Sequence, residues 1–348
     1  MSFLKIMLIA SIAVFGFIGF KAYSKKRIEA QKNETASQLL VPKEKDKDVL
    51  LKPIQVESGH NYLMKHDPSK AIKTAKKVQE DDHDEKVDRI GQLFSTGRDK
   101  LPIVETVTYS SRVSWIKGRP AWIADYASHY ATSRHFIARS LNGKEDYITQ
   151  NVSTGDRFNV LRMDKNINFY LLVDLSRLKM WFYYLDLDQN EKVLLKTYRI
   201  GVGRLEHNGE SLTPTGRYLL GDKVATYKPG TVGPFQNKAI EMIQVFGTRW
   251  LPFKEELGDC AKAAKGYGIH GAPCLLDQES KNVKENRECI GQYDSDGCIR
   301  LYKEDIEELF SIVVTRPTIV EVVKDSSKLR EEKIENLQSI TLELQERH

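Results

Sequence analysis

The pattern of apolar and polar residues divides the chain into five segments, of which the first is an uncharged apolar run. Residues 6–20 read IMLIASIAVFGFIGF, with Lys5 before them and basic residues at 21 and 25–27 after them. A helix of this length is shorter than a bilayer core of roughly 30 Å, but flanking apolar residues lengthen it if the lysines snorkel. The pattern predicts a transmembrane signal anchor over 1–24. A cleaved signal peptide is the alternative, although no Ala-x-Ala-like site follows the run.

Two further segments are dominated by charge. Residues 25–104 include KEKDKD at 43–48 and EDDHDEK at 80–86 and show no sustained periodicity, which predicts a solvated linker. Residues 325–348 place Ile334, Leu337 and Leu344 on a charged background. This pattern predicts an amphipathic C-terminal helix that either packs on the core or allows self-association with a second copy of the chain.

Residues 105–165 form a small unit with mixed periodicity. An alternating stretch at 105–109 predicts a strand, and apolar residues at helical spacing follow in RPAWIADYASHYATSRHFIARSLNG at 119–143. Ser133 is suited to cap a second helix, and Gly155-Asp156 predicts a turn into a closing strand. The order is therefore strand, helix, helix, strand.

Residues 166–324 are rich in β-prone runs. NFYLLVDL at 168–175, KMWFYYLD at 179–186 and VLLKTYRI at 193–200 predict three strands. Thr213-Pro214-Thr215-Gly216 predicts a turn into a further strand, and TRPTIVEVV at 315–323 predicts a closing one. We expect a mainly β domain with a helix that begins at about Lys303.

Composition excludes several classes of protein. The chain has 348 residues, 41% hydrophobic and 29% charged, which argues against collagen, wholesale disorder and a polytopic membrane protein. A net charge of +5 over this length lacks the concentrated basic stripe that nucleic-acid binding requires. Four cysteines are too few for a disulfide scaffold of this size.

The candidate chemistry lies in GYGIHGAPC at 266–274 and QYDSDGCIRLYKEDIEELF at 292–310. A thiol with an ordinary pKa near 8.5 needs a neighbouring imidazole to become a nucleophile at neutral pH. His270 is the best-placed base for Cys298, because glycines beside it allow close approach of other backbone. Backbone N–H groups of Gly297 and Cys298 are candidates for an oxyanion hole, and Arg300 for binding a substrate carboxylate.

These residues resemble the motif of the L,D-transpeptidase (YkuD-type) family, and the resemblance covers about 160 residues. It implies a β-sandwich catalytic domain over 166–324 with a short helix after the cysteine motif, and it implies no cofactor and no metal. The residues that it implies for the site are, in the catalytic group, Cys298, His270, Gly271, Ser295 and Gly297, and, for substrate binding, Arg300, Asp296 and Tyr267.

The resemblance also implies the reaction and its place. Cys298 attacks the carbonyl that links the L-centre of diaminopimelate to the terminal D-Ala of a peptidoglycan stem, and a second stem or water completes a 3,3 cross-link or a trimmed tripeptide. We therefore expect a single-pass protein of the bacterial inner membrane with its body in the periplasm or cell envelope, although the basic flank after the anchor favours the opposite orientation.

The 105–165 unit resembles a LysM domain, a glycan-binding module. The matching features are Trp122-Ile123-Ala124, Leu141-Asn142 and Gly155-Asp156-Arg157-Phe158. Gly118-Arg119 stands where the family has Gly-Asp. A generic structural α+β subdomain is the alternative.

Two departures from the transpeptidase motif leave other functions open. Asp296 stands in place of the family's second histidine, where it either raises the pKa of the thiol, points away or orients the base. His270 and Cys298 are 28 positions apart, which implies an insert around 274–288. A catalytically inactive peptidoglycan-binding protein is one alternative.

The remaining cysteines allow two further hypotheses. A disulfide between Cys274 and Cys289 is worth about 3 kcal/mol for a loop of this length. A zinc site built from His270, Cys274, Cys289 and Cys298 is the second, and it would make the chain a zinc-stabilised structural module. Cys260 and His135 are assigned to core packing.

Overall fold

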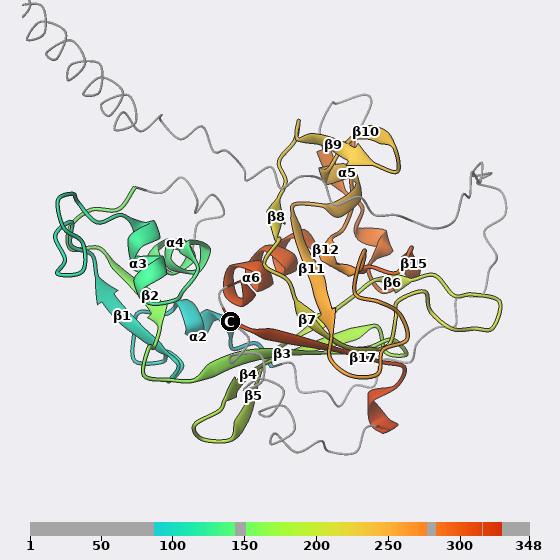
Figure 1. Ribbon diagram of the computed structural model, residues 1–348, viewed down its shortest axis with the longest axis horizontal. Helices are drawn as coiled ribbons and strands as arrows, with labels where there is room; N and C mark the ends of the chain where they lie inside the picture. The colour runs from blue at the N-terminus through green and yellow to red at the C-terminus, as the bar shows by residue number, and fades with distance from the viewer. Residues whose placement is uncertain (1–86, 143–150, 277–282, 315, 329–348) are drawn as a thin grey trace, which may run out of the picture. The chain divides into compact units, whose positions relative to one another are not determined.

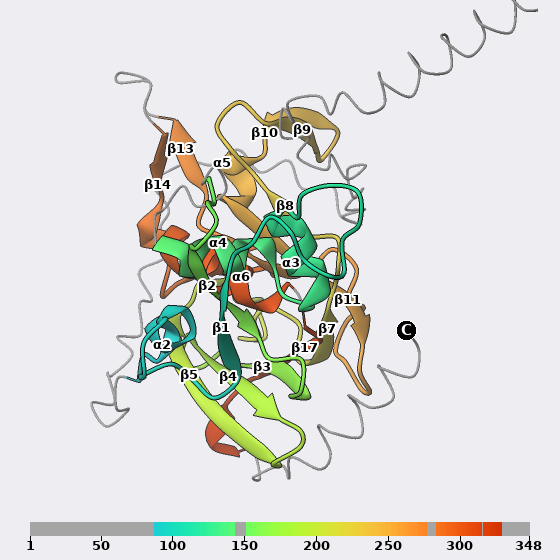
Figure 2. The ribbon, with the colours of Figure 1, turned by 90° about the vertical axis from the view of Figure 1, so that its left-hand side faces the viewer.

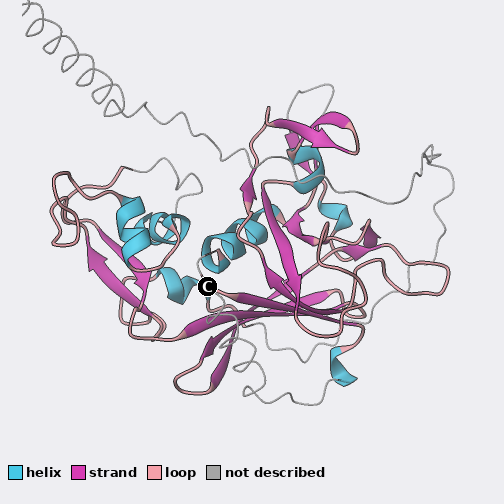
Figure 3. Cartoon of the chain, viewed as in Figure 1, coloured by secondary structure: helices cyan, strands magenta, loops and turns pink. Residues whose placement is uncertain are grey.

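The computed structural model describes residues 87–142, 151–276, 283–314 and 316–328, and strands make up most of its regular structure (Figure 3). The predicted anchor at 1–24, most of the predicted linker and residues 329–348 of the predicted C-terminal helix lie outside these ranges. Within the described residues, no helix is long and apolar enough to cross a membrane.

The elements can be followed in chain order in Figure 1. In the first part they are α2 Ile90–Phe94, β1 Val104–Thr108, α3 Ile123–His129, α4 Arg134–Asn142 and β2 Arg157–Leu161. In the second they are β3 Ile167–Asp174, β4 Lys179–Asp186, β5 Glu191–Arg199, β6 Val202–Gly203, β7 Gly216–Leu220, β8 Ala225–Thr226, β9 Val232–Phe235, β10 Lys238–Glu241, α5 Ile243–Phe246, β11 Arg249–Glu256, β12 Gly268–Gly271, β13 Cys274–Leu276, β14 Val283–Glu285, β15 Tyr293–Ser295, β16 Ile299–Leu301, α6 Lys303–Val313 and β17 Thr318–Val323. Short 3₁₀ helices cover Arg287–Cys289 and Ser326–Lys328.

The first part contains the predicted strand, helix, helix and strand. β1 and β2 pair antiparallel, from Val104 opposite Leu161 to Thr108 opposite Arg157. The hydroxyl oxygen of Ser133 accepts a hydrogen bond from the backbone N–H of His135 at 3.0 Å, which caps α4 as expected. The βααβ order follows directly from the hydrophobic periodicity.

The predicted linker ends earlier than expected. α2 begins at Ile90, and Ile90, Leu93, Leu101 and Ile103 are buried in the main hydrophobic core. These apolar residues are few and widely spaced, so the charged residues before them outweighed them in the sequence pattern. Residues 90–104 are part of the folded body, and the linker prediction is wrong for them.

The second part is a mixed sheet in which the predicted strands appear as β3, β4, β5, β7 and β17. Nine strands belong to it, in the order β16-β12-β11-β7-β17-β3-β4-β5, with β8 on β11. β17 is parallel to β3 and β12 is parallel to β16, whereas the other pairs are antiparallel. The predicted helix after the cysteine motif is α6.

The expected β-sandwich takes the form of one continuous path of strands. The first half of β11, Trp250–Pro252, pairs with β12, and its second half, from Phe253 to Glu256, pairs with β7. The register shifts between Phe253 and Glu255, which is a bulge, and a bulge bends a strand and increases its twist. β11 therefore joins the β12–β16 edge of the sheet to the strands on the other side of β7.

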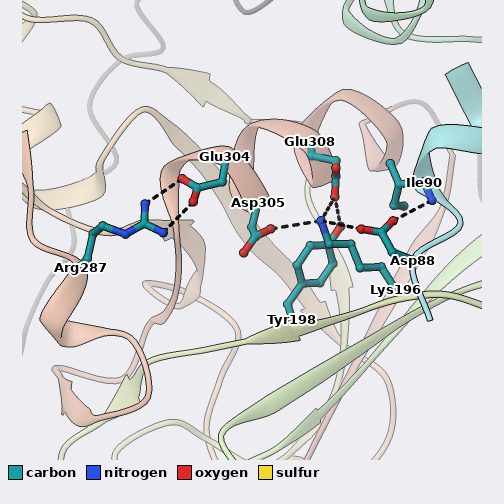
Figure 4. A network of polar contacts seen from close by, with 8 residues as sticks. All are labelled: Asp88, Ile90, Lys196, Tyr198, Arg287, Glu304, Asp305 and Glu308. Atoms are coloured by element: carbon teal, nitrogen blue, oxygen red, sulfur yellow. Dashed lines mark hydrogen bonds and ion pairs between the residues drawn. The ribbon is translucent and has the colours of Figure 1, made fainter. Parts of the chain in front are cut away.

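α6 packs on β11 and β12 and is held by ionic contacts along its first half (Figures 1 and 4). Lys196 of β5 bonds Glu308 at 2.7 Å and lies 3.3 Å from Asp305 and 3.5 Å from Asp88. In the first turn of the helix, Arg287 makes a bidentate contact with Glu304 (Figure 4). The helix after the cysteine strand is thereby tied to β5, to the segment before α2 and to the 274–288 insert.

Candidate active site

The candidate nucleophile and base lie on neighbouring strands. β12 and β16 run parallel, with Ile269 opposite Ile299 and His270 opposite Arg300. Cys298 immediately precedes β16, and successive side chains of a strand point to opposite faces. Cys298 therefore lies on the same face of this strand pair as His270 and Arg300, although the thiol and the imidazole are far apart in the sequence.

A backbone carbonyl selects the tautomer of His270. The Nδ1 atom lies 2.7 Å from the carbonyl oxygen of Gly271, and because a carbonyl only accepts, Nδ1 carries the proton. The lone pair of the ring is then on Nε2, the nitrogen that is free to take a proton from a thiol. Gly271 thus acts on the His270 ring through its backbone carbonyl.

The His270 ring is enclosed by aromatic side chains and is only 3% exposed. The ring centroids of Phe246 and Trp250 lie 5.4 Å and 5.9 Å from its own. Burial, followed by the positive charge of Arg300, lowers the pKa of His270 to about 3, against the opposing hydrogen bond to Gly271. The imidazole is neutral at pH 7 and is therefore able to act as a base.

The Cys298 thiol is protonated at rest. Burial raises its pKa to about 12, while a hydrogen bond with the Gly268 backbone and the charge of Arg300 lower it, and the carboxylate of Asp296 raises it. Because the thiol and the imidazole are both neutral, attack by Cys298 requires that the thiol proton move when the substrate is attacked. The site favours general-base assistance over a preformed thiolate.

Ser295 shapes the loop that carries the nucleophile. Its hydroxyl donates to the carbonyl oxygen of Cys298 at 2.6 Å and accepts from the N–H of Gly297 at 3.1 Å. The predicted oxyanion donor at Gly297 is therefore engaged with Ser295. Gly297 has φ +119°, and a Cβ there would lie 2.6 Å from the ring of Tyr267. Only glycine therefore fits at position 297.

Gly247 and Gly271 allow the segment after α5 to lie against β12. Gly247 has φ +60°, and a Cβ on it would lie 2.6 Å from the carbonyl oxygen of Ala272 and 2.7 Å from the carbonyl carbon of Gly271. This contact supports the carbonyl that orients His270. Sequence reasoning missed Gly247, Phe246 and Trp250, for which the only signal was the FGTRW stretch at 246–250.

The residues predicted to bind substrate have differing surroundings. Arg300 contacts Asp294 at 3.0 Å, and its side chain is 17% exposed. Tyr267 packs against Gly297. Asp296 forms an exposed ion pair with Arg204 through Oδ1, so its carboxylate is directed to that cation and does not orient the histidine.

The disulfide hypothesised between Cys274 and Cys289 is not formed in the structure, in which all four cysteines carry free thiols. The Cys289 thiol donates to the carbonyl oxygen of Asn286 at 3.1 Å, and that of Cys274 lies 3.9 Å from the carbonyl oxygen of Ala272. Each thiol is thus directed to its own local backbone. In the described part of the chain, no group of three or more metal-ligating residues could hold a metal ion, which removes the zinc hypothesis.

A thiol and a neutral imidazole of fixed tautomer on one face of a strand pair are the groups that a cysteine–histidine nucleophilic site requires. The profile of the YkuD family, described as the L,D-transpeptidase catalytic domain, matches residues 168–322. Residues 168–322 are therefore similar to the catalytic domain of YkuD-type L,D-transpeptidases.

Two relatives, each named as a candidate L,D-transpeptidase YkuD, are similar to this region. The one from Bacillus subtilis is 33% identical over 137 residues, which is 39% of this chain and 58% of the relative. The one from Bacillus licheniformis is 27% identical over 192 residues, which is 54% of this chain and 85% of the relative. The chain thus spans less than two thirds of the first of them.

Two solved structures are similar to this chain at low sequence identity. The helical cell shape determining protein Pgp2 of Campylobacter jejuni is 18% identical, with 49% of this chain and 52% of that chain covered and a TM-score of 0.31. Bd1075 of Bdellovibrio bacteriovorus is 15% identical, with 49% and 55% covered and a TM-score of 0.33. At these scores, neither structure bears on the reaction.

Proposed function

We propose that this chain is a peptidoglycan L,D-transpeptidase or L,D-carboxypeptidase with Cys298 as nucleophile and His270 as general base. The observation that carries the proposal is the hydrogen bond between Nδ1 of His270 and the carbonyl of Gly271, because it leaves Nε2 as a proton acceptor on the face that carries Cys298. The match of residues 168–322 to the L,D-transpeptidase catalytic domain supports this chemistry.

In the first half-reaction, Sγ of Cys298 forms a bond to the carbonyl carbon between diaminopimelate and D-Ala while its proton moves to Nε2 of His270. The tetrahedral intermediate then breaks the bond to the amide nitrogen. The proton passes from His270 to that nitrogen, so that D-Ala leaves as an amine and a thioester remains on Cys298. Proton transfer of this kind contributes about 10²- to 10⁴-fold to a rate.

In the second half-reaction, the amine of another stem or a water molecule attacks the thioester. His270 removes a proton from the attacking group, and the thiol of Cys298 is restored. An amine acceptor gives a 3,3 cross-link, and water gives a tripeptide stem. His270 has low exposure, which favours an acceptor that displaces water from the site. The product that forms shows whether the acceptor is an amine or water.

The test is mass spectrometry of muropeptides after incubation with the wild type and with Cys298→Ala. Cross-linked dimers indicate transpeptidation, tripeptides indicate trimming, and both should vanish in the variant. Thiol acylation by a carbapenem-type lactam, lost in Cys298→Ala, is a second readout that needs no acceptor. Unchanged muropeptide processing by Cys298→Ala would contradict the nucleophile assignment.

A peptidoglycan-binding protein without catalytic activity is the second candidate. The raised pKa of Cys298 and the presence of Asp296 at the position of the family's second histidine favour it. It predicts that the purified protein binds sacculi and leaves every stem peptide unchanged, which the same mass spectra distinguish from catalysis.

We further propose that the βααβ module at 104–161 is LysM-like and binds glycan strands, and that the apolar segment 1–24 anchors the body outside the cytoplasmic membrane. The order of elements in the module and the exposed Trp122 support the first idea. Sacculus binding by a chain without residues 104–161, and protease access to tags at both ends, test the two ideas. Self-association through 325–348 is tested by sedimentation with and without that segment.

A further inference from the structure

An exposed ion pair stands beside the nucleophile. Asp296 is two positions from Cys298, and its carboxylate contacts the guanidinium of Arg204. The side chains are 71% and 60% exposed, so solvent and a ligand can reach both. An ion pair this exposed adds little to stability, typically below about 1 kcal/mol.

The contact between Arg204 and Asp296 differs from three bidentate arginine–carboxylate pairs of the described residues, and it resembles Arg300–Asp294 and Arg287–Glu285, each joined by one hydrogen bond. Arg119 with Asp125, Arg162 with Asp164 and Arg287 with Glu304 are each joined by two parallel hydrogen bonds. In the Arg204–Asp296 pair, one hydrogen bond joins Nη1 to Oδ1. The second carboxylate oxygen and the remaining guanidinium donors are therefore left for another molecule.

The backbone around Arg204 is fixed to the nucleophile loop. The N–H of Arg204 donates to the carbonyl of Ser295 at 2.9 Å, and the N–H of Leu212 donates to the carbonyl of Arg204 at 3.0 Å. Gly203, which precedes Arg204, is held by the hydroxyl of Thr213 at 2.7 Å. The cation is thus placed against the loop of Cys298 by backbone as well as by its own charge.

We propose that the Arg204–Asp296 pair is the subsite that receives the zwitterionic end of the diaminopimelate side chain in the acyl donor. This inference rests on the proposed function. The attacked carbonyl belongs to the L-centre of diaminopimelate, and a short methylene chain separates that centre from a carboxylate and an ammonium on one carbon. Arg204 binds the carboxylate, and the free oxygen of Asp296 binds the ammonium.

The reach of this side chain suits the position of the pair. Cα atoms two residues apart are at most about 7 Å from each other, so Asp296 lies within one extended side chain of the thiol. Opposite charges that face outward side by side match a zwitterion, whereas they match a simple anion or cation only in part. The pair therefore selects donors with both charges.

The test compares two donor tetrapeptide stems that differ in one group. A stem with lysine at the third position has the same terminal ammonium as diaminopimelate but lacks its carboxylate. Arg204→Gln should raise KM about ten-fold for the diaminopimelate stem and leave KM for the lysine stem unchanged. Asp296→Asn should raise KM for both stems. Arg162→Gln, which removes an exposed pair outside the catalytic domain, is the matched control and should change neither.

If Arg204→Gln changes KM equally for the two stems, or for neither, the inference is overturned. Turnover of the stems by the wild type upholds the proposed function in that case. A shift in the pH profile of kcat for every donor in Asp296→Asn, with KM unchanged, also overturns the inference, because Asp296 then acts on the thiol. If the wild type processes neither stem, the proposed function fails. Calorimetry with the two tripeptides then decides the subsite: a preference for the diaminopimelate peptide that Arg204→Gln abolishes supports it, and no preference overturns it.

Discussion

Two histidines of this chain have their pKa lowered to about 3 by burial, in different regions of the molecule. His135 lies on α4 with its ring 5.2 Å from that of Phe310 of α6. His270 lies on β12 beside the strand that follows Cys298. A lowered pKa by itself therefore does not identify a base. The face that His270 shares with a thiol, together with the carbonyl of Gly271, distinguishes the catalytic candidate from the packing one.

The largest effect should come from the thiol. Cys298→Ala should abolish acyl transfer, because no other atom at the site can form the thioester. The matched control is Cys289→Ala, which removes a buried thiol that donates to local backbone and should keep most of the activity. Muropeptide mass spectra measure both variants, and equal losses would contradict the special role of Cys298.

The next effect separates the two histidines. His270→Gln should lower kcat by about 10²- to 10⁴-fold, because the variant has no proton acceptor for the thiol. His135→Gln should alter thermal stability and leave kcat per folded molecule near the wild-type value. Single-turnover acylation together with a melting curve measures this contrast. Comparable losses of kcat in both variants would mean that burial, rather than position, determines the role.

A smaller effect should follow when the support of His270 is disturbed. Gly247→Ala places a Cβ against Ala272 and Gly271 at a positive φ and should cost about 1–3 kcal/mol of unfolding free energy while lowering kcat. Gly258→Ala is the control, because Gly258 has φ +92° and nothing within 4 Å of the added Cβ. It should cost about 1 kcal/mol and leave kcat unchanged. Urea unfolding and kcat of both variants test whether the Gly271 contact matters.

The last effect concerns stability and not activity, and the two histidines should share it. Both are neutral in the folded protein at a pH where the unfolded chain, with an ordinary pKa of 6.5, binds protons. Their contribution to stability is complete above pH 6.5 and is lost as the pH falls toward 3, at up to about 1.4 kcal/mol per pH unit for each. His135→Gln and His270→Gln should reduce the slope between pH 5 and 6.5 by similar amounts. Urea titrations at several pH values measure it, and an unchanged slope in either variant would show that its histidine is not buried in neutral form.

Local patterns in the sequence were sufficient for much of the fold. Alternating and continuous apolar runs predicted β3, β4, β5 and β17, since a strand in a buried sheet must be apolar along its length. The helical spacing around 119–143 and the cap at Ser133 predicted α3 and α4. The spacing of glycines around His270 and Cys298 predicted the candidate pair, because close backbone approach needs residues without a side chain.

Only the tertiary structure decided how these pieces meet. The early end of the linker, the bulge that lets β11 serve two neighbours and the separate surroundings of Cys274 and Cys289 all depend on contacts between distant residues. The same is true of the tautomer of His270 and of the pair that Arg204 forms with Asp296, 92 positions away. Sequence periodicity determines which face of an element is apolar, whereas strand register determines which side chains meet across the sheet, and register is set by the fold as a whole.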